Sequence, residues 1–315
     1  MAARFPMAVV VVGSPLTVTI EGASAVVAAE DFVGGLTTGD RVQAAFLGDR
    51  LVVLARAGGN SPNPNLIIDS NFAVNQRGYV SGTDLALNAY GLDRWKATTA
   101  NSRMTFTAAP QGQAVTIAAG DSFGQVVERA NVVAGPHTLS WPGTSQARIY
   151  NVGASAPSYA ASPITVALDG TTDVLAQFGP GTVGNVKLEQ GSVATPYQPP
   201  TYADNLRACM RYYQRFGGAS PYQRFGLGFN ISTTQARIHI PYVTQMRVTP
   251  TGTWGELRLD DASSTAMATN LIVQVASTTV GYLTVTVASG LASGMPVDLR
   301  ADGSSAGFVA FDSEL

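Results

Sequence analysis

Apolar and polar residues alternate twice in the stretch MTFTAAPQGQAVTI, which covers residues 104–117. The two alternating runs are residues 104–107 and 114–117, and residues 164–168 repeat the pattern. A period of two residues places successive side chains on opposite faces of an extended chain, so each run predicts a half-buried β-strand. Short strands separated by turn residues predict a two-sheet β-sandwich over residues 61–200.

The composition favours the same fold class. Charged residues make up 13% of the 315 residues, about half of the roughly 25% that is usual in soluble domains. The 33 glycines and 17 prolines supply turns between short strands. One core rarely serves a chain of this length, so we expect several domains and an all-β fold. Trp95 and Trp141 are expected in the core of the sandwich, and Trp254 has a better chance of being exposed.

Residues 1–60 are predicted to form a separate small unit. Strand-like runs occupy residues 7–12, 16–20, 25–28, 41–46 and 50–55. Five short strands within 60 residues predict a small β-barrel. The unit ends in the sequence GGNSPNP at residues 58–64, which is typical of a flexible linker.

One helix is predicted, over residues 202–216. Its apolar side chains recur at steps of three and four, at Tyr202, Leu206, Cys209, Met210, Tyr213 and Phe216. Thr201 or Asp204 is a candidate N-cap, and Gly217 and Gly218 end the pattern. Strand-like runs follow at residues 237–240, 271–276, 282–287 and 308–311, so residues 201–315 are predicted to be a linking helix and a C-terminal β-sandwich tip.

Charge, length of the apolar runs and cysteine count exclude several classes of function. The net charge of −2 gives no strong field for nucleic acid or a membrane surface. The apolar run at residues 7–12 is far shorter than the about 20 residues of a membrane span, and we expect neither a span nor a signal peptide. Cys209 is the only cysteine, and with two histidines it argues against a zinc site. We predict no metal and no cofactor.

Patterns that resemble catalytic motifs are better explained by turns, and we predict that the chain is not an enzyme. Residues 303–307 match a nucleophile elbow around Ser305, but no histidine follows it. Residues 179–184 lack the lysine of a phosphate-binding loop. Glu189 is expected to accept hydrogen bonds at the end of a strand, and residues 169–173 are expected to form a hairpin turn in preference to a calcium site.

Four stretches in order resemble the tail-fibre and minor tail proteins of bacteriophages. They are NLIIDSNFAVNQRG (65–78) with Asp93, Arg94 and Trp95, VKLEQGSVATPYQ (186–198) running into LRACMRYYQRF (206–216), IPYVTQMRVTPT (240–251) and FDSEL (311–315). The resemblance covers residues 65–315. It implies a jelly-roll module at 61–200, carbohydrate-binding-like, and a tip domain at 201–315. Residues 1–60 resemble small barrels that attach such proteins to other virion tail proteins.

The resemblance also implies an assembly and a function. It implies a homotrimer in the phage tail, made and assembled in the host cytoplasm, that binds a host-surface glycan or other receptor. Leu206, Met210 and Tyr213 would face a three-fold axis, and the alternative is that the helix packs on its own chain. A purely structural tail, collar or decoration protein is the alternative function. A glycan depolymerase is disfavoured, because Asp93, Glu189, Asp260 and Asp261 match a glycosidase in residue type only.

Residues 205–255 combine six arginines with aromatic residues and contain no Asp or Glu. Guanidinium groups bind anionic groups and flat rings stack on sugars, but subunit interfaces are enriched in the same residues. Nucleic-acid binding is the weakest of the three interpretations. The candidate contacts are Arg211, Arg215, Tyr222, Arg224, Phe225, Tyr242, Arg247 and Trp254. The acidic residues within 256–315 are expected to attract this window across subunits.

Overall fold

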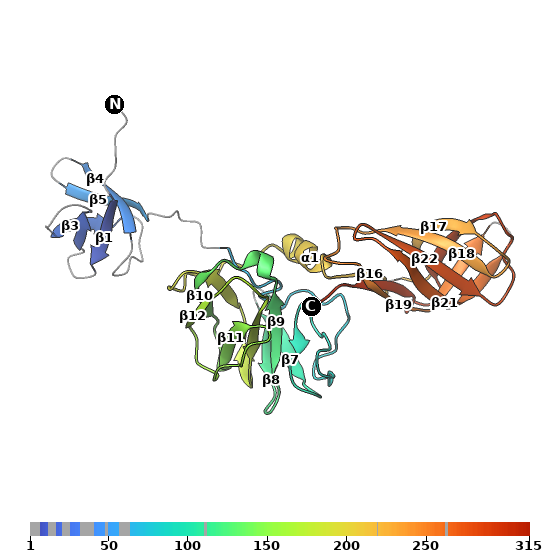
Figure 1. Cartoon of the computed structure of the whole chain (residues 1–315), viewed down its shortest axis with the longest axis horizontal. Helices are drawn as coiled ribbons and strands as arrows, with labels where there is room; N and C mark the ends of the chain where they lie inside the picture. Colours follow the sequence, from blue (N-terminus) through green and yellow to red (C-terminus); the bar gives the residue numbers. More distant parts are fainter. Residues whose placement is uncertain are drawn as a thin grey trace. The chain divides into compact units, whose positions relative to one another are not determined.

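The computed structural model describes residues 7–11, 17–20, 26–31, 41–47, 50–56, 64–109, 112–218, 220–261 and 264–315. The chain divides into two compact units, Met1–Pro64 and Asn65–Leu315. The described residues form 24 strands, one α-helix and one short 3-10 helix, which confirms the all-β prediction (Figure 1). Residues 57–63, which hold most of the predicted linker, lie outside the described residues.

Five strands of the first unit close into a barrel. They are β1 (Met7–Val11), β2 (Thr17–Ile20), β3 (Val26–Asp31), β4 (Arg41–Leu47) and β5 (Arg50–Arg56). The order around the barrel is β1-β2-β3-β5-β4. Neighbouring strands are antiparallel except β3 and β5, which are parallel. Each of the five runs expected from the sequence overlaps one of these strands.

Residues 65–200, here called the central part, contain three antiparallel sheets and the 3-10 helix η1 (Arg129–Asn131). The strand orders are β11-β13-β9-β6, β12-β10-β15 and β14-β8-β7. The strands are β6 (Lys96–Ala97), β7 (Met104–Ala109), β8 (Gly112–Ile117), β9 (Phe123–Val127), β10 (Gly135–Ser140), β11 (Ala147–Asn151), β12 (Ile164–Leu168), β13 (Val174–Phe178), β14 (Gly181–Val183) and β15 (Lys187–Gln190).

Aromatic rings in tilted and edge-on contact lie in the core of the central part. The ring of Trp95 lies 4.5 Å from that of Phe72 and 5.9 Å from that of Phe178, and the ring of Trp141 lies 5.2 Å from that of Phe178. Both tryptophans are buried, which confirms the sequence expectation. Such edge and tilted ring pairs add to the free energy gained from burying their area.

Two polar predictions for the central part have different outcomes. Glu189 is fully buried and accepts hydrogen bonds from the backbone N–H (2.7 Å) and hydroxyl (2.6 Å) of Thr195, which confirms its structural role. Residues 169–173 form a turn in which Asp169 Oδ1 accepts from the backbone N–H of Thr171 at 2.7 Å. The turn is not a hairpin, because it joins β12 and β13, which belong to different sheets.

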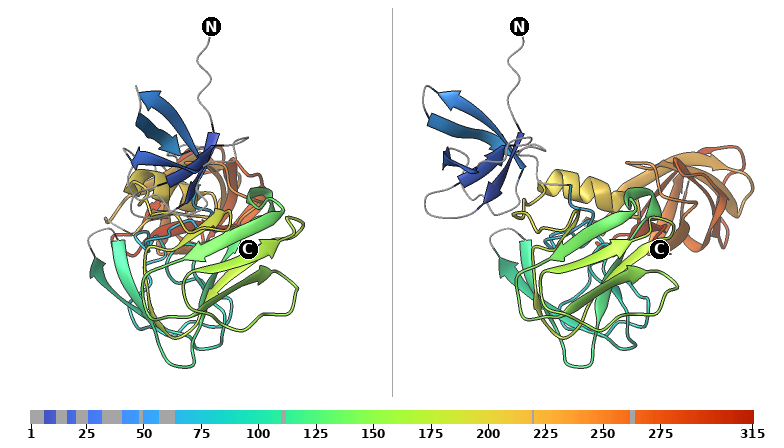
Figure 2. Two further views of the ribbon diagram at one scale, coloured as in Figure 1. Left: turned by 90° about the vertical axis from the view of Figure 1, so that its left-hand side faces the viewer. Right: turned by 60° about the vertical axis from the view of Figure 1, so that its left-hand side comes forward.

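The predicted helix exists but is shorter than expected. Helix α1 covers Tyr202–Met210, and Thr201 caps it by accepting from the backbone N–H of Asp204. The helix prediction is wrong beyond Met210, because Tyr213 and Phe216 belong to strand β16 (Tyr213–Gly217), which pairs with a strand almost 100 residues later. Figures 1 and 2 show α1 between the central part and the C-terminal strands.

Residues 201–315, here called the C-terminal part, end in a closed barrel and a small sheet. The barrel order is β17-β18-β22-β21-β20-β23, and the sheet order is β16-β24-β19. The strands are β17 (Arg224–Asn230), β18 (Gln235–Pro241), β19 (Thr251–Gly255), β20 (Leu257–Asp261), β21 (Thr265–Ala276), β22 (Val280–Val287), β23 (Pro296–Ala301) and β24 (Phe308–Asp312). The sequence predicts a sandwich here. A barrel forms because β17 pairs with both β18 and β23, which leaves its six strands without a free edge.

Candidate functional site on the C-terminal barrel

The structure does not bring the eight candidate contacts of the Arg–aromatic window together. Arg211 and Arg247 lie where the C-terminal part meets the central part. Phe225, Tyr242 and Trp254 pack against the apolar core of the barrel. Trp254 is half-buried, which makes it more exposed than Trp95 and Trp141, as expected. Tyr222 and Arg224 are exposed on the barrel surface, and Arg215 lines a cleft.

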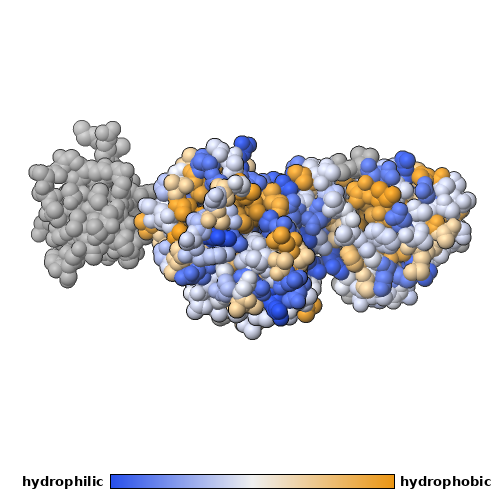
Figure 3. Space-filling model, turned by 60° about the horizontal axis from the view of Figure 1, so that its bottom comes forward, coloured by the Kyte–Doolittle hydropathy of each residue, from blue (hydrophilic) through white to orange (hydrophobic). Residues whose placement is uncertain are grey.

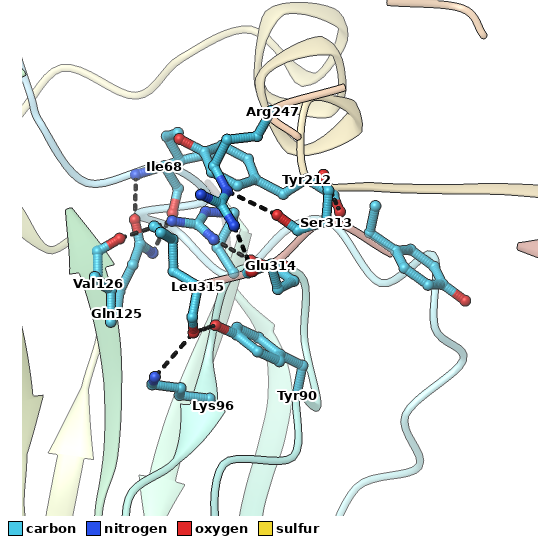
Figure 4. A network of polar contacts seen from close by, with 12 residues as sticks. Ile68, Tyr90, Lys96, Gln125, Val126, Tyr212, Arg247, Ser313, Glu314 and Leu315 are labelled. Carbon is cyan, nitrogen blue, oxygen red and sulfur yellow. Dashed lines mark hydrogen bonds and ion pairs between the residues drawn. The ribbon is translucent and has the colours of Figure 1, made fainter. Parts of the chain in front are cut away.

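Arg247 holds the last residues of the sequence, which run from β24 into the loops of the central part (Figure 4). Its Nε donates to the carbonyl oxygen of Ser313 at 2.7 Å and its Nη2 to that of Glu314 at 2.8 Å. Tyr90 Oη and Lys96 Nζ of the central part donate to the carbonyl oxygen of Leu315 at 2.6 and 3.0 Å. Two of the three nitrogen atoms of the Arg247 guanidinium are therefore used within the fold.

The carboxylate of Glu314 pairs with two arginines of the central part, the buried Arg94 and the half-buried Arg77. Arg94, 1% exposed, bonds one oxygen of Glu314, and Arg77 Nη2 lies 3.3 Å from the other. Each guanidinium also covers an aromatic ring, Arg94 over Tyr212 at 3.5 Å and Arg77 over Tyr213 at 3.8 Å. We call the contacts of residues 77, 94, 247 and 313–315 the junction network. Buried charges are stable only when they are paired in this way.

The residues proposed for a three-fold axis do not form one helix face. Tyr213 lies in β16 and is buried beneath Arg77 of its own chain, so it is not a helix residue. The buried residues of α1 are Asn205 and Cys209. Asn205 binds Asp69 of the central part in both directions at 2.9 Å, which agrees with packing on the same chain. Leu206 and Met210 are half-buried.

Two carboxyl groups beside the junction network are enclosed by protein. Burial raises the pKa of Asp69 to about 8, against the lowering effect of hydrogen bonds from the backbone N–H groups of Val74 and Ala73. Burial likewise raises the pKa of Asp93 to about 6, although Gln76 donates to it at 2.6 Å. Shifted carboxyl groups are a common mark of active sites. Both of these are buried to 1% exposure or less, so they offer no surface to a substrate.

Three arginines on neighbouring strands of the barrel are paired with acidic residues of the same chain. Arg224, Arg300 and Arg258 lie side by side on β17, β23 and β20. Three acidic residues offset their repulsion: Arg224 Nε lies 2.5 Å from Asp298, Arg300 Nε lies 3.0 Å from Asp260, and Arg258 bonds Asp302. These acidic residues therefore pair with arginines of their own chain, and Arg224 is the member of the Arg–aromatic window among them.

The barrel also exposes a patch that the sequence did not reveal. Its members lie on neighbouring strands, because Leu227 pairs with His239 and His239 with Tyr282, while Phe229 pairs with Arg237. Leu227 is 68% and Phe229 46% exposed. The rings of His239 and Tyr282 lie 4.8 Å apart, and Arg237 Nη1 donates to Tyr282 Oη at 2.7 Å. We call these five residues the outer wall patch.

The glycines of strand β17 explain why Leu227 and Phe229 of this patch point outward. It reads RFGLGFN, in which Gly226 and Gly228 alternate with Leu227 and Phe229. A Cβ on Gly228 would lie 1.7 Å from the carbonyl oxygen of Arg237, so only glycine allows β17 to approach β18. Leu227 and Phe229 consequently point outward, opposite to the usual arrangement, whereas Phe225 packs against the core.

The patch offers stacking surfaces and donors without a catalytic arrangement. Exposed ring faces beside a guanidinium suit the binding of a sugar or a protein surface. Apolar residues in Figure 3 lie in several separate groups among hydrophilic ones. Within the described residues there is no group of three His, Cys, Asp or Glu that could hold a metal ion. None of the described helices has the length and apolar character needed to cross a membrane. No family model matches the chain, and no curated protein matches it.

Proposed function

We propose that the chain is a bacteriophage tail-fibre or minor tail protein that attaches to the host surface by binding glycans. In this proposal residues 1–60 bind other virion tail proteins, residues 61–200 are a jelly-roll module, and residues 201–315 form the distal tip. The protein is a homotrimer, assembled in the host cytoplasm, and acts without catalysis. The four ordered sequence stretches in residues 65–315 and the all-β fold support the proposal.

The outer wall patch is the observation that carries the adhesive part of the proposal. Scattered apolar residues are normal on a protein surface, whereas adjoining ones often mark a binding site. Leu227, Phe229 and Tyr282 offer apolar and aromatic surface, and Arg237 and His239 offer polar groups beside it. Such a surface binds one sugar weakly. Three copies in a trimer, and several fibres on a virion, would multiply the affinity.

The test compares matched surface substitutions in the full chain. The double variant Leu227→Ser/Phe229→Ser removes the apolar part of the patch. The control Val80→Ser changes a residue of the central part that is 68% exposed, as Leu227 is. Binding to host cells and to a glycan array is measured for each protein. We expect the double variant to lose most binding and Val80→Ser to keep it. Full binding by the double variant would overturn the role of the patch.

The structural alternative has the same patch as its support, since Arg and aromatic residues are also enriched at subunit interfaces. Light scattering separates the two functions. If the patch binds glycans, the double variant keeps the trimer and loses adhesion. If the patch is a subunit interface, the same variant loses the trimer. Release of new reducing ends from host polysaccharide by the unaltered protein would contradict the non-enzymatic proposal.

A further inference from the structure

A polar cleft of about 550 Å³ lies between a loop of the central part and strand β16. It is lined by residues 75–78 and by Arg215, Gly217 and Gly218. These residues supply two guanidinium groups and no carboxylate. None of them belongs to the outer wall patch, so the cleft is a separate place on the molecule.

The two arginines of the cleft differ in their charge partners. Arg77 is neutralised, because its Nη1 lies 2.8 Å from Asp312 and its Nη2 lies 3.3 Å from Glu314. Arg215 has no carboxylate and no hydrogen-bond acceptor among the described residues. Its guanidinium lies 4.0 Å from the centroid of the Phe308 ring. A ring face attracts a cation but accepts little from its N–H groups, so the donors of Arg215 stay available.

The turn after β16 is shaped to hold this guanidinium against the backbone. Gly217 and Gly218 have φ angles of +95° and +83°, a region that favours glycine. A Cβ on Gly218 would lie 3.2 Å from Arg215 Nη2. The backbone N–H of Gly218 donates to the carbonyl oxygen of Gly307 at 2.9 Å, which fixes the turn to the strand region that carries Phe308. Arg215 is therefore held between a ring and a fixed turn.

We infer that this cleft binds an oxyanion group, a carboxylate or a phosphate, carried by a small ligand such as an acidic saccharide. The planar guanidinium of Arg215 presents paired donors that match both groups in a two-pronged contact. Its stacking on Phe308 reduces the entropy lost on binding. The volume of the cleft lies in the range of small-molecule sites. The inference goes beyond the proposed function and holds even if the outer wall patch binds nothing.

The test measures the binding of three probes to the full chain by titration calorimetry and NMR. Methyl glucuronide supplies a carboxylate, glucose 6-phosphate supplies a phosphate, and methyl glucoside is the neutral control. We expect at least one anionic probe to bind and the neutral probe not to bind. Their relative affinities then decide which oxyanion the cleft prefers.

Substitutions locate the site. Arg215→Gln should weaken binding of the anionic probe by on the order of tenfold to a hundredfold, because hydrogen bonds to charged groups are strong. Arg215→Lys should lie in between, since it keeps the charge and loses the planar fork. Arg207→Gln is the matched control. Arg207 is exposed on α1 and has no acceptor or ring contact among the described residues, so its removal should leave binding unchanged.

Several outcomes would overturn the inference: no binding of either anion, equal binding of the neutral probe, or equal loss in Arg207→Gln and Arg215→Gln. If Arg215→Gln fails to fold, Arg215→Lys and Gly218→Ala replace it, and unchanged binding by both would refute the site. Leu227→Ser/Phe229→Ser should still bind the anion. Loss of adhesion with retained anion binding, or the reverse, shows which proposal has failed.

Discussion

The junction network and the outer wall patch both place an arginine beside a tyrosine, but in different surroundings. At the junction, Arg94 covers the ring of Tyr212 at 3.5 Å, is almost fully buried and pairs with Glu314. On the outer wall, Arg237 lies 5.5 Å from the ring of Tyr282 and donates to its hydroxyl group at 2.7 Å. The enclosed pair joins two parts of one unit, whereas the half-buried pair lies beside the exposed Leu227 and Phe229. Arginine next to tyrosine in a sequence does not distinguish these cases.

Loss of the acid at the junction should have the largest effect. Glu314→Ala leaves Arg94 buried without its carboxylate, and breaking a buried pair costs about 3–5 kcal/mol. Chemical unfolding of the full chain measures this change. Arg103→Ala is the control, because Arg103 and Asp84 are 55% and 57% exposed and such pairs contribute up to about 1 kcal/mol. Similar losses in both variants would mean that the junction pair is no stronger than a surface pair.

The buried carboxyl groups should make stability fall as the pH rises. Unfolded Asp69 releases its proton near pH 4, but folded Asp69 keeps it up to about pH 8. The stabilisation is complete below about pH 4 and is lost as the pH approaches 8, with Asp93 adding to the loss up to about pH 6. Asp69→Asn should flatten the profile by on the order of a few kcal/mol. Unfolding curves between pH 4 and 8 test this, and identical slopes in the two proteins would contradict it.

A buried hydroxyl group in the barrel should be dispensable. Burial raises the pKa of Tyr242 to about 12, and its Oη has no hydrogen-bond partner among the described residues. Tyr242→Phe keeps the ring contact with Phe311 and removes the unpaired group. We expect unchanged stability or a gain of about 1 kcal/mol in the free energy of unfolding. A loss larger than that would show that the hydroxyl has a partner in solution.

The smallest effect is expected on the outer wall. Tyr282→Phe removes the acceptor of Arg237 at a half-exposed position, where water replaces the lost bond. The free energy of unfolding should fall by less than about 1 kcal/mol. Thermal unfolding of Tyr282→Phe and Tyr242→Phe, measured together, compares a paired hydroxyl group near the surface with an unpaired buried one. A drop as large as that of Glu314→Ala would place this pair with the junction network.

Strands were predictable from the sequence where a local pattern decides them. Residues 104–107, 114–117 and 164–168 all lie within observed strands, because alternation is a property of neighbouring residues. The helix was predictable only up to Met210. Tyr213 and Phe216 continue its spacing of three and four, but pairing with β24 decides their conformation. Strand β24 is so far along the chain that a pattern of neighbouring residues cannot predict this pairing.

The candidate site was harder to predict for a related reason. Arg247 and Trp254 have the residue types of a binding surface, but their exposure depends on contacts with distant residues. Leu227 and Phe229 would ordinarily be assigned to a core, and only the intervening glycines of β17 reverse their direction. Arg215 was a candidate by type alone. Its place in a cleft depends on residues 75–78, which lie far from it in sequence.

The junction network constrains the order in which parts of the chain can finish folding during synthesis. Tyr90 and Lys96 leave the ribosome more than 200 residues before Leu315, the residue whose carbonyl oxygen they bind. Arg94 likewise has to wait for Glu314. The loops of the central part can therefore reach their final form only after the barrel strands have been made. Contacts over such sequence distances slow folding, and Arg94 lacks its carboxylate partner until they form.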